Sequence, residues 1–170
     1  LCRDWSSDVC SSDLFQDLHN TKRIVFCFDR GRSLRIREFP QYKLRRQDDQ
    51  IDEKQRKARH EIRRQMQLLR REYLTEIGYK NVLSQHGYEA DDIIASVCNR
   101  IATKQGEAII IGSDKDLYQL LSPRVSLYNP RIHKMLTLQA FVKDYGISPT
   151  SWIDVKALAG CVTDGVPGIA

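Results

Sequence analysis

A short apolar segment that ends on a pair of acids constrains the fold more than any other feature. Residues 108–112 read Ala-Ile-Ile-Ile-Gly, and Ser113-Asp114-Lys115-Asp116 follows at once. A run of isoleucines this short, closed by glycine, predicts a fully buried strand. A parallel α/β sheet brings the carboxyl ends of its strands to one edge. We therefore predict an α/β, Rossmann-like fold with a mostly parallel central sheet flanked by helices, and Asp114 and Asp116 at that edge.

Two other acidic positions are predicted to reach the same edge. An apolar strand at 24–28 ends on Asp29, and Glu89, Asp91 and Asp92 open an apolar helix at about 89–104. One or two acids at a helix N-terminus ordinarily complement its macrodipole. Three acids in four positions, facing two acidic strand ends, favour a chemical role instead.

Close carboxylates repel one another and raise each other's pKa, so a cluster of this size requires divalent cations. Oxygen ligands favour Mg²⁺ or Mn²⁺ over Zn²⁺, because no pair of His or Cys residues stands nearby at ligand spacing.

The basic residues are concentrated in one part of the chain. Between Arg30 and Arg71 there are fifteen Lys or Arg against six Asp or Glu, although the net charge is only +5. This density predicts a phosphate-binding surface, and a solvated charged helix is the alternative. A long helix is predicted from 48 to about 77, and its polar first half is expected to stand clear of the sheet or to be mobile without its partner.

The remaining elements follow from periodicity and capping signals. We predict an extended segment at 34–37, a helical segment after Pro40 that places Lys43 and Arg46 on one face, strands at 79–83, 125–128 and 133–136, and helices at 116–121, 137–145 and 148–160.

Length, cysteine spacing and hydropathy narrow the class of protein. A chain of 170 residues suits one domain. Cysteines at 2, 10, 27, 98 and 161 show no paired spacing, which favours reduced thiols in a cytosolic protein. No run of eighteen apolar residues is present, so no membrane span is predicted.

Residues 1–14 have neither helical nor strand periodicity. From Asp4 onward they resemble the translation of a sequencing-adapter oligonucleotide. We expect a non-native tail here and the natural protein from about Phe15.

Four blocks together resemble the structure-specific 5′ nuclease family, which includes flap endonucleases, phage 5′ exonucleases and the 5′ nuclease domain of bacterial DNA polymerase I. The blocks are 28–33 with 42–46, 87–92, 113–117 and 157–168. The long basic insert is more similar to the phage enzymes. The resemblance implies a PIN-like catalytic domain at 15–160, a basic helical arch at about 40–77, and the start of a helix-hairpin-helix DNA-binding region at 161–170.

The resemblance also implies roles for single residues. Asp29, Glu89 and Asp91 would hold the first of two Mg²⁺ or Mn²⁺ ions, Asp114 would lie between them, and Asp116 with Asp164 would hold the second, while Asp92 would support or join that site. Lys43 and Arg46 would contact the scissile phosphate and, with Asp91 and Asp114, form the catalytic set. The DNA-binding residues would be Arg30, Arg32, Tyr42, Lys43, Arg46, Lys54, Arg56, Lys57, Arg59, Arg63 and Arg64.

The implied function is a 5′-3′ exonuclease and flap endonuclease that hydrolyses DNA by a two-metal mechanism. Its partner would be DNA with a 5′ flap or 5′ end, including RNA-primed ends, and it would act as a monomer in the cytoplasm of a bacterial or phage-infected cell. Because Cys161 stands where the family has an acid, a nuclease-like module that binds branched nucleic acid without cutting is the main alternative.

Two rival classes of enzyme fit the acids less well. A phosphatase would use Asp114 as its nucleophile, but Tyr118 stands where that class has Thr or Val. A small metal-dependent ribonuclease of related fold would not need so long a basic insert.

Overall fold

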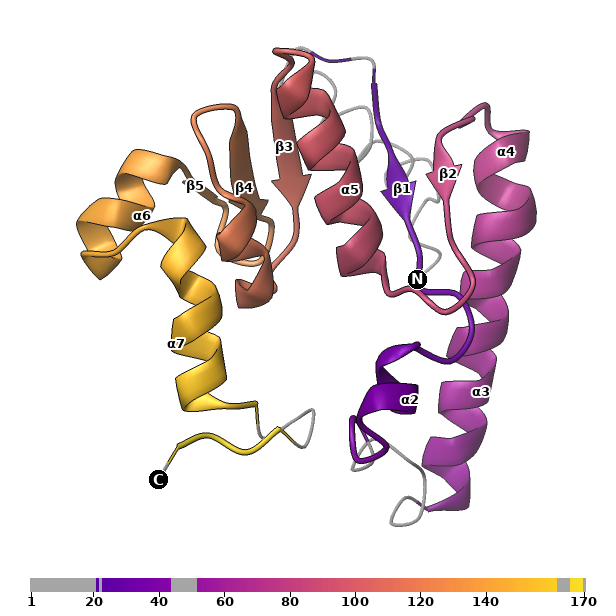
Figure 1. Ribbon diagram of the computed structural model, residues 1–170. Coiled ribbons are helices and arrows are strands. Elements are labelled where there is room, and N and C mark those ends of the chain that lie inside the picture. Colours follow the sequence, from indigo (N-terminus) through magenta and orange to yellow (C-terminus); the bar gives the residue numbers. More distant parts are fainter. Residues whose placement is uncertain (1–20, 22, 44–51, 162–165, 170) are drawn as a thin grey trace.

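The computed structural model describes residues 21, 23–43, 52–161 and 166–169. Helices and strands alternate along most of this length, as predicted for an α/β fold (Figure 1). The elements are β1 (Phe26–Cys27), α2 (Arg35–Glu38), α3 (Glu53–Leu68), the π-helical η2 (Leu69–Tyr73), α4 (Leu74–Glu76), β2 (Val82–Leu83), α5 (Ala90–Thr103), β3 (Ala108–Ile111), the 3₁₀ helix η3 (Lys115–Leu120), β4 (Val125–Asn129), β5 (Lys134–Leu136), α6 (Leu138–Tyr145), the 3₁₀ helix η4 (Pro149–Ser151) and α7 (Trp152–Ala159).

The strands form two hydrogen-bonded groups within the described residues. β1 pairs with β2 in parallel, β3 pairs with β4 in parallel, and β5 adds to β4 in antiparallel orientation. Helix α5 contacts both β1 and β3 (Figure 1). The predicted mostly parallel arrangement is therefore confirmed, and α5 links its two parts.

The buried core lies on the β3-β4-β5 side of the molecule. Phe141 and Leu127 are its most deeply buried side chains. Phe141 of α6 packs edge to face on Trp152 of α7, with ring centroids 5.7 Å apart, and Tyr118 and Tyr145 complete the aromatic group. This packing fixes α6 and α7 against the sheet and places the loops that leave β3.

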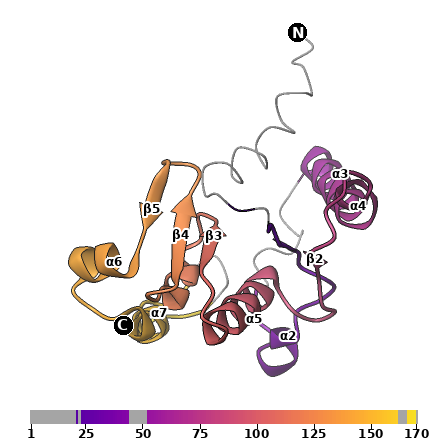
Figure 2. The same ribbon diagram turned by 90° about the horizontal axis from the view of Figure 1, so that it is seen from above.

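Helix α3 stands clear of the sheet, as predicted. The side chain of Asp52 caps it by accepting from the Gln55 amide at 2.7 Å, and every residue from Glu53 to Gln67 is exposed. It lies on the opposite side of β2 from α5 (Figures 1 and 2). The predicted continuous helical run is confirmed from residue 53 to 76, with η2 as a wider turn inside it.

Two local predictions before α3 are wrong. The extended segment predicted at 34–37 is instead helix α2, because the pair of Arg35 with Asp92 holds this short segment on α5. Lys43 does not lie on a helical face, since it lies in a turn with a left-handed φ of 57°. Arg46 lies outside the described residues.

Strands β1, β2 and β3 differ from expectation. Only Ile110 of β3 is fully buried, whereas Ile109 and Ile111 are 39% and 43% exposed, so the prediction of a strand buried on both faces is wrong. Among the described residues, the core covers a single face of β3. The predicted strands at 24–28 and 79–83 are reduced to two residues each.

The later elements match their predicted positions. Thr137 caps α6 by accepting from the Ala140 amide, and Ser148 opens η4 with Pro149 behind it. Cys27 and Cys98 are free thiols, as expected from their apolar sequence context. None of the described helices combines the length and the apolar character needed to cross a bilayer.

Candidate active site

Five of the predicted acids line one pocket. Asp29, Glu89, Asp91, Asp114 and Asp116 surround a cavity of about 260 Å³ together with Tyr42, Lys43 and Ala90. Asp29 follows β1, Glu89 and Asp91 open α5, and Asp114 and Asp116 follow β3. The structure thus brings together acids from three distant parts of the chain.

Backbone hydrogen bonds hold the loop after β1 against the start of α5. Gly87 donates to the Arg30 carbonyl at 2.8 Å, and its own carbonyl accepts from the Leu34 amide at 2.8 Å. Gly87 has a φ of 85°, and a Cβ there would lie 2.8 Å from Cγ of Leu34. Only glycine fits this close approach without displacement.

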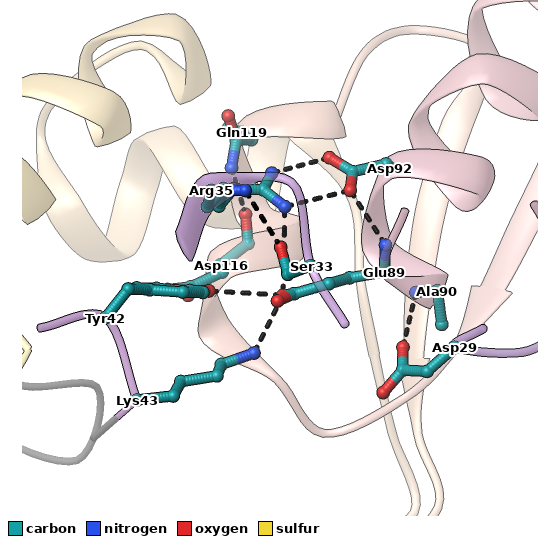
Figure 3. Close-up of polar contacts among 10 residues, drawn as sticks. All are labelled: Asp29, Ser33, Arg35, Tyr42, Lys43, Glu89, Ala90, Asp92, Asp116 and Gln119. Carbon is teal, nitrogen blue, oxygen red and sulfur yellow. Dashed lines mark hydrogen bonds and ion pairs between the residues drawn. The ribbon is translucent and has the colours of Figure 1, made fainter. Parts of the chain in front are cut away.

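The acids themselves fix the pocket's backbone. Oδ1 of Asp29 accepts from the Ala90 amide at 2.6 Å (Figure 3). Asp114 caps η3 by accepting from the Asp116 amide at 2.9 Å. Glu89 and Asp92 form a reciprocal capping box at the N-terminus of α5. These bonds hold the carboxylates of Asp29, Glu89, Asp92 and Asp114 in position.

The crowding of acids in the pocket disfavours ionisation of Asp91. Burial raises its pKa, and the neighbouring charges of Asp114, Asp29 and Glu89 raise it further. A carboxyl group whose ionised form is disfavoured by its neighbours gains from a cation placed among them.

Glu89 is neutralised by residues that sequence analysis assigned to DNA binding. Lys43 Nζ lies 2.7 Å from Glu89 Oε2, and the Tyr42 hydroxyl donates to the same oxygen at 3.1 Å (Figure 3). Burial is the largest single effect and opposes ionisation of Glu89, but the hydrogen bond and charge of Lys43, together with hydrogen bonds from Ser33 and Tyr42, outweigh it and lower the pKa of the carboxyl group. Burial alone would lower the pKa of Lys43, but its hydrogen bonds and charge interactions with Glu89 and Tyr42 together raise it.

Lys156 of α7 is a pocket neighbour that sequence analysis missed. Its Nζ lies 2.8 Å from Oδ1 of Asp116, and this hydrogen bond raises the pKa of Lys156. In the sequence, Lys156 could be noticed only because it directly precedes the 157–168 block. The packing of α7 on η3 places its side chain beside Asp116.

Arg35 is the second missed neighbour. Its Nη1 and Nη2 bind the two oxygens of Asp92 at 2.9 and 2.5 Å, and Nη1 lies 3.8 Å from Oε2 of Glu89. The paired guanidinium lowers the pKa of Asp92. Asp92 does not line the pocket and is occupied by Arg35.

The side chains of the pocket fit a hard divalent cation, because they supply carboxylate oxygens as ligands. These carboxylates surround Asp91, whose pKa is raised. Within the described residues, no three acid, His or Cys side chains are already arranged to bind one ion. Asp164, the remaining predicted ligand, lies outside the described residues.

The predicted DNA-binding residues form a second, exposed group. Arg30 and Arg32 lie in the turn after β1, and Lys54, Arg56, Lys57, Arg59, Arg63 and Arg64 lie on α3, all of them exposed. Lys57 and Arg64 pair within the helix with Glu53 and Glu61. Arg70 was not among the predicted DNA-binding residues. Burial lowers its pKa, and the nearby charges of Arg30 and Arg71 lower it further. The basic surface therefore continues from α3 toward the turn after β1.

The fold defines the class of protein. The structure superimposes on the bacteriophage T5 flap endonuclease in its complex with DNA and metal ions with a TM-score of 0.81 and 20% identity, covering 96% of this chain and 60% of that one. A bacteriophage T5 5′-exonuclease with bound zinc gives a TM-score of 0.83 at 21% identity, with coverage of 96% and 60%. At this level of identity the likeness establishes the resolvase-like α/β fold.

Sequence comparison then gives the family. The model of the 5′-3′ exonuclease N-terminal resolvase-like domain matches residues 10–146, and this chain belongs to that family. A 5′-3′ exonuclease of Buchnera aphidicola subsp. Acyrthosiphon pisum is 34% identical over 160 residues, which cover 92% of this chain and 51% of the relative. A thermostable DNA polymerase I of Thermus thermophilus is 36% identical over 106 residues, covering 62% and 12%. The chain spans about half the length of the Buchnera relative.

Proposed function

We propose that this chain is the catalytic part of a 5′-3′ exonuclease and flap endonuclease that hydrolyses phosphodiester bonds in DNA with divalent metal ions. The pocket of five carboxylates beside Lys43 is the observation that carries this proposal. Its substrate would be DNA with a 5′ single-stranded flap or a 5′ end, RNA-primed ends included. Family membership and the DNA and metal complexes of the phage T5 enzyme support this substrate class.

Two Mg²⁺ or Mn²⁺ ions are proposed for the pocket. Asp29, Glu89 and Asp91 would hold one ion, Asp114 would lie between the two, and Asp116 with Asp164 would hold the other. When bound, such ions activate water and stabilise the charge that develops on the phosphate. The chain's own residues orient these carboxylates through the amides of Ala90 and Asp116.

Basic side chains would bring DNA to the pocket. Lys43, once released from Glu89, can reach the phosphate beside the carboxylates, and we assign Arg46 to the same task. Helix α3 offers exposed cations clear of the core, which suits an arch around a single strand. Tyr42 presents an aromatic ring under Lys43, with the ammonium 4.9 Å from the ring centre.

We also propose that the protein works as a monomer in the cytoplasm, that residues 161–170 begin a helix-hairpin-helix, and that 1–14 are non-native.

A binding module that holds branched nucleic acid without cutting it is the second candidate. The ion pairs of Glu89 with Lys43 and of Asp116 with Lys156 favour it, because they already neutralise two of the proposed ligands. Cys161 at a position where the family has an acid favours it further, since a thiol is a poor Mg²⁺ ligand.

Cleavage of a 5′-labelled flap duplex, with and without Mg²⁺, separates the two candidates. The nuclease releases the flap only with the metal, and Asp114→Asn lowers the rate by about a hundredfold or more while DNA binding persists. Asp144→Asn, an exposed acid of α6 outside the pocket, is the matched control and keeps the parent rate. DNA binding by the parent chain without metal-dependent cleavage would establish the binding module instead.

A further inference from the structure

Arg35 connects α2 to the first turn of α5. Its two terminal nitrogens bind both oxygens of Asp92, and Oδ2 of Asp92 also accepts from the Glu89 amide at 3.0 Å (Figure 3). Asp92 is the third helical residue of α5, and Glu89 and Asp91 lie on either side of its start. A continuous chain of hydrogen bonds therefore runs from α2 to the backbone that carries two pocket acids.

The same short segment reaches the pocket from its other end. α2 is followed by the turn that bears Tyr42 and Lys43, both of which donate to Glu89. The Arg35 side chain is 47% exposed, whereas those of Asp92 and Glu89 are 26% and 13% exposed. A bidentate guanidinium–carboxylate pair fixes orientation as well as charge, which a single ammonium contact does not.

We infer that Arg35 is a positioning residue for the proposed metal site, and that Asp92 serves as its anchor on α5 rather than as an ion ligand. By holding Asp92, Arg35 fixes the orientation of Glu89 and Asp91 toward the pocket. Within the described residues, the Asp92 side chain makes two hydrogen bonds with Arg35 and one with the Glu89 amide, which commit this carboxylate to the helix start.

Two possible roles of Arg35, as a nearby positive charge or as a positioning residue, predict opposite effects of its loss on divalent-ion binding. If Arg35 acted only through its charge, its loss would remove a cation near the acids and tighten divalent-ion binding. If it positions the acids, its loss weakens ion binding and slows turnover, because the ligands no longer hold their orientation. Removing such supporting partners of a metal site lowers affinity or activity by about 10- to 100-fold.

The variants for the test are Arg35→Met, Arg35→Lys, Asp92→Asn and the Arg35→Met/Asp92→Asn double, with Arg37→Met as the control. Arg37 is an exposed arginine of the same helix. We expect Arg35→Met and Asp92→Asn each to weaken Mn²⁺ binding by about tenfold. The double variant falls no further than either single, since both break one connection. Arg35→Lys recovers part of the loss, and Arg37→Met matches the parent.

Kinetics on flap DNA add a second measurement, which rests on the proposed function. kcat falls by about tenfold or more in both single variants while KM for DNA stays within about twofold. A raised KM with kcat preserved in Arg35→Met alone would show a direct DNA contact and overturn the inference. Tighter Mn²⁺ binding in Arg35→Met would overturn it as well.

Amide hydrogen exchange keeps the inference testable if the parent chain does not cleave DNA. In Arg35→Met, the amides of residues 89–92 should exchange faster than in the parent, while those of residues 98–101 remain unchanged. Equal protection of residues 89–92 in the variant and the parent would overturn the role of Arg35 without bearing on cleavage. Uniformly faster exchange across α5 would likewise reject a local role.

Discussion

Two acids of the pocket are paired with lysines although both are proposed metal ligands. Glu89 accepts from Lys43 and Tyr42, and Asp116 pairs with Lys156, so two lysines neutralise acids that would otherwise repel one another. At Asp91 the charge of Lys43 lowers the pKa, but burial and three neighbouring carboxylates outweigh it. Lys43 and Lys156 therefore balance part of the negative charge of the acidic cluster.

Lys43→Met should strengthen divalent-ion binding to the pocket. Lys43 competes with an ion for Glu89, and a partly exposed ion pair contributes up to about 1 kcal/mol, or up to about fivefold in affinity. Calorimetric titration with Mn²⁺ measures the change. Lys57→Met, which removes a lysine paired with Glu53 on α3, is the control and leaves the affinity unchanged. Weaker Mn²⁺ binding in Lys43→Met would contradict competition.

Asp91→Asn should stabilise the metal-free protein near neutral pH. The raised pKa of Asp91 means that the folded chain binds its proton more tightly than the unfolded chain. Folding therefore loses stability as pH rises from the ordinary pKa of an aspartic acid through the raised value, and the cost stays fully present above it. Asparagine removes that cost.

Thermal unfolding across this pH range measures the effect of Asp91→Asn. We expect a higher melting temperature at neutral pH, by about 2–4 °C for each 1 kcal/mol gained, and a smaller difference at acidic pH. Mg²⁺ should raise the melting temperature of the parent but much less that of the variant. A variant that is less stable than the parent at neutral pH would show that Asp91 contributes stabilising contacts that outweigh the repulsion.

Helices α3 and α5 contribute different groups: α5 carries acids of the pocket, and α3 carries exposed cations. The first turn of α5 presents Glu89 and Asp91 to the pocket, and its body packs against β1 and β3. α3 is exposed along its length and carries cations but no buried residue. An element with so little packing depends on its cap and on charge pairs, and it is free to present its basic face to a polyanion.

Replacing Lys54, Arg56 and Arg63 together by Gln should weaken binding of single-stranded DNA and reduce its salt dependence. Each lost phosphate contact lowers the slope of log K against log salt by about 0.7 for single strands, so the slope should fall by up to about 2. The matched control replaces Lys104, Lys134 and Lys143, exposed lysines away from α3, with the same charge change. Fluorescence anisotropy at several salt concentrations gives both slopes, and equal losses in the two triple variants would rule out a specific role for α3.

The whole molecule separates its core from its pocket. The buried cluster lies among β3, β4, β5, α6 and α7, whereas the acids gather where the ends of β1 and β3 meet the start of α5. The pocket thus depends on α5 to join a well-packed part to the two-residue strands β1 and β2.

Phe141→Ala should destabilise the fold by about 3–5 kcal/mol, because it removes a fully buried ring from the aromatic cluster. Val142→Ala, at the next position and 44% exposed, should change stability by less than about 0.5 kcal/mol. Urea unfolding of the two variants measures the difference. Similar free energies of unfolding for both would show that this cluster does not hold the molecule together.

The sequence alone determined the class of fold and which acids would meet. Strand and helix periodicity set the order of elements, and the rule that parallel strands end at one edge brought Asp29 and Asp114 together, since both depend on local pattern and chain direction. The long helix and the caps at Thr137 and Ser148 were predictable for the same reason.

Only the tertiary structure decided what those acids contact. The pairs of Arg35 with Asp92 and of Lys156 with Asp116 join residues 57 and 40 positions apart, at distances that local pattern does not encode. The helical turn of α2 and the left-handed turn at Lys43 also arise from docking on α5, which overrides the weak local preference of these short segments. Side-chain partners across a pocket depend on how whole elements pack, and that packing exists only in the folded chain.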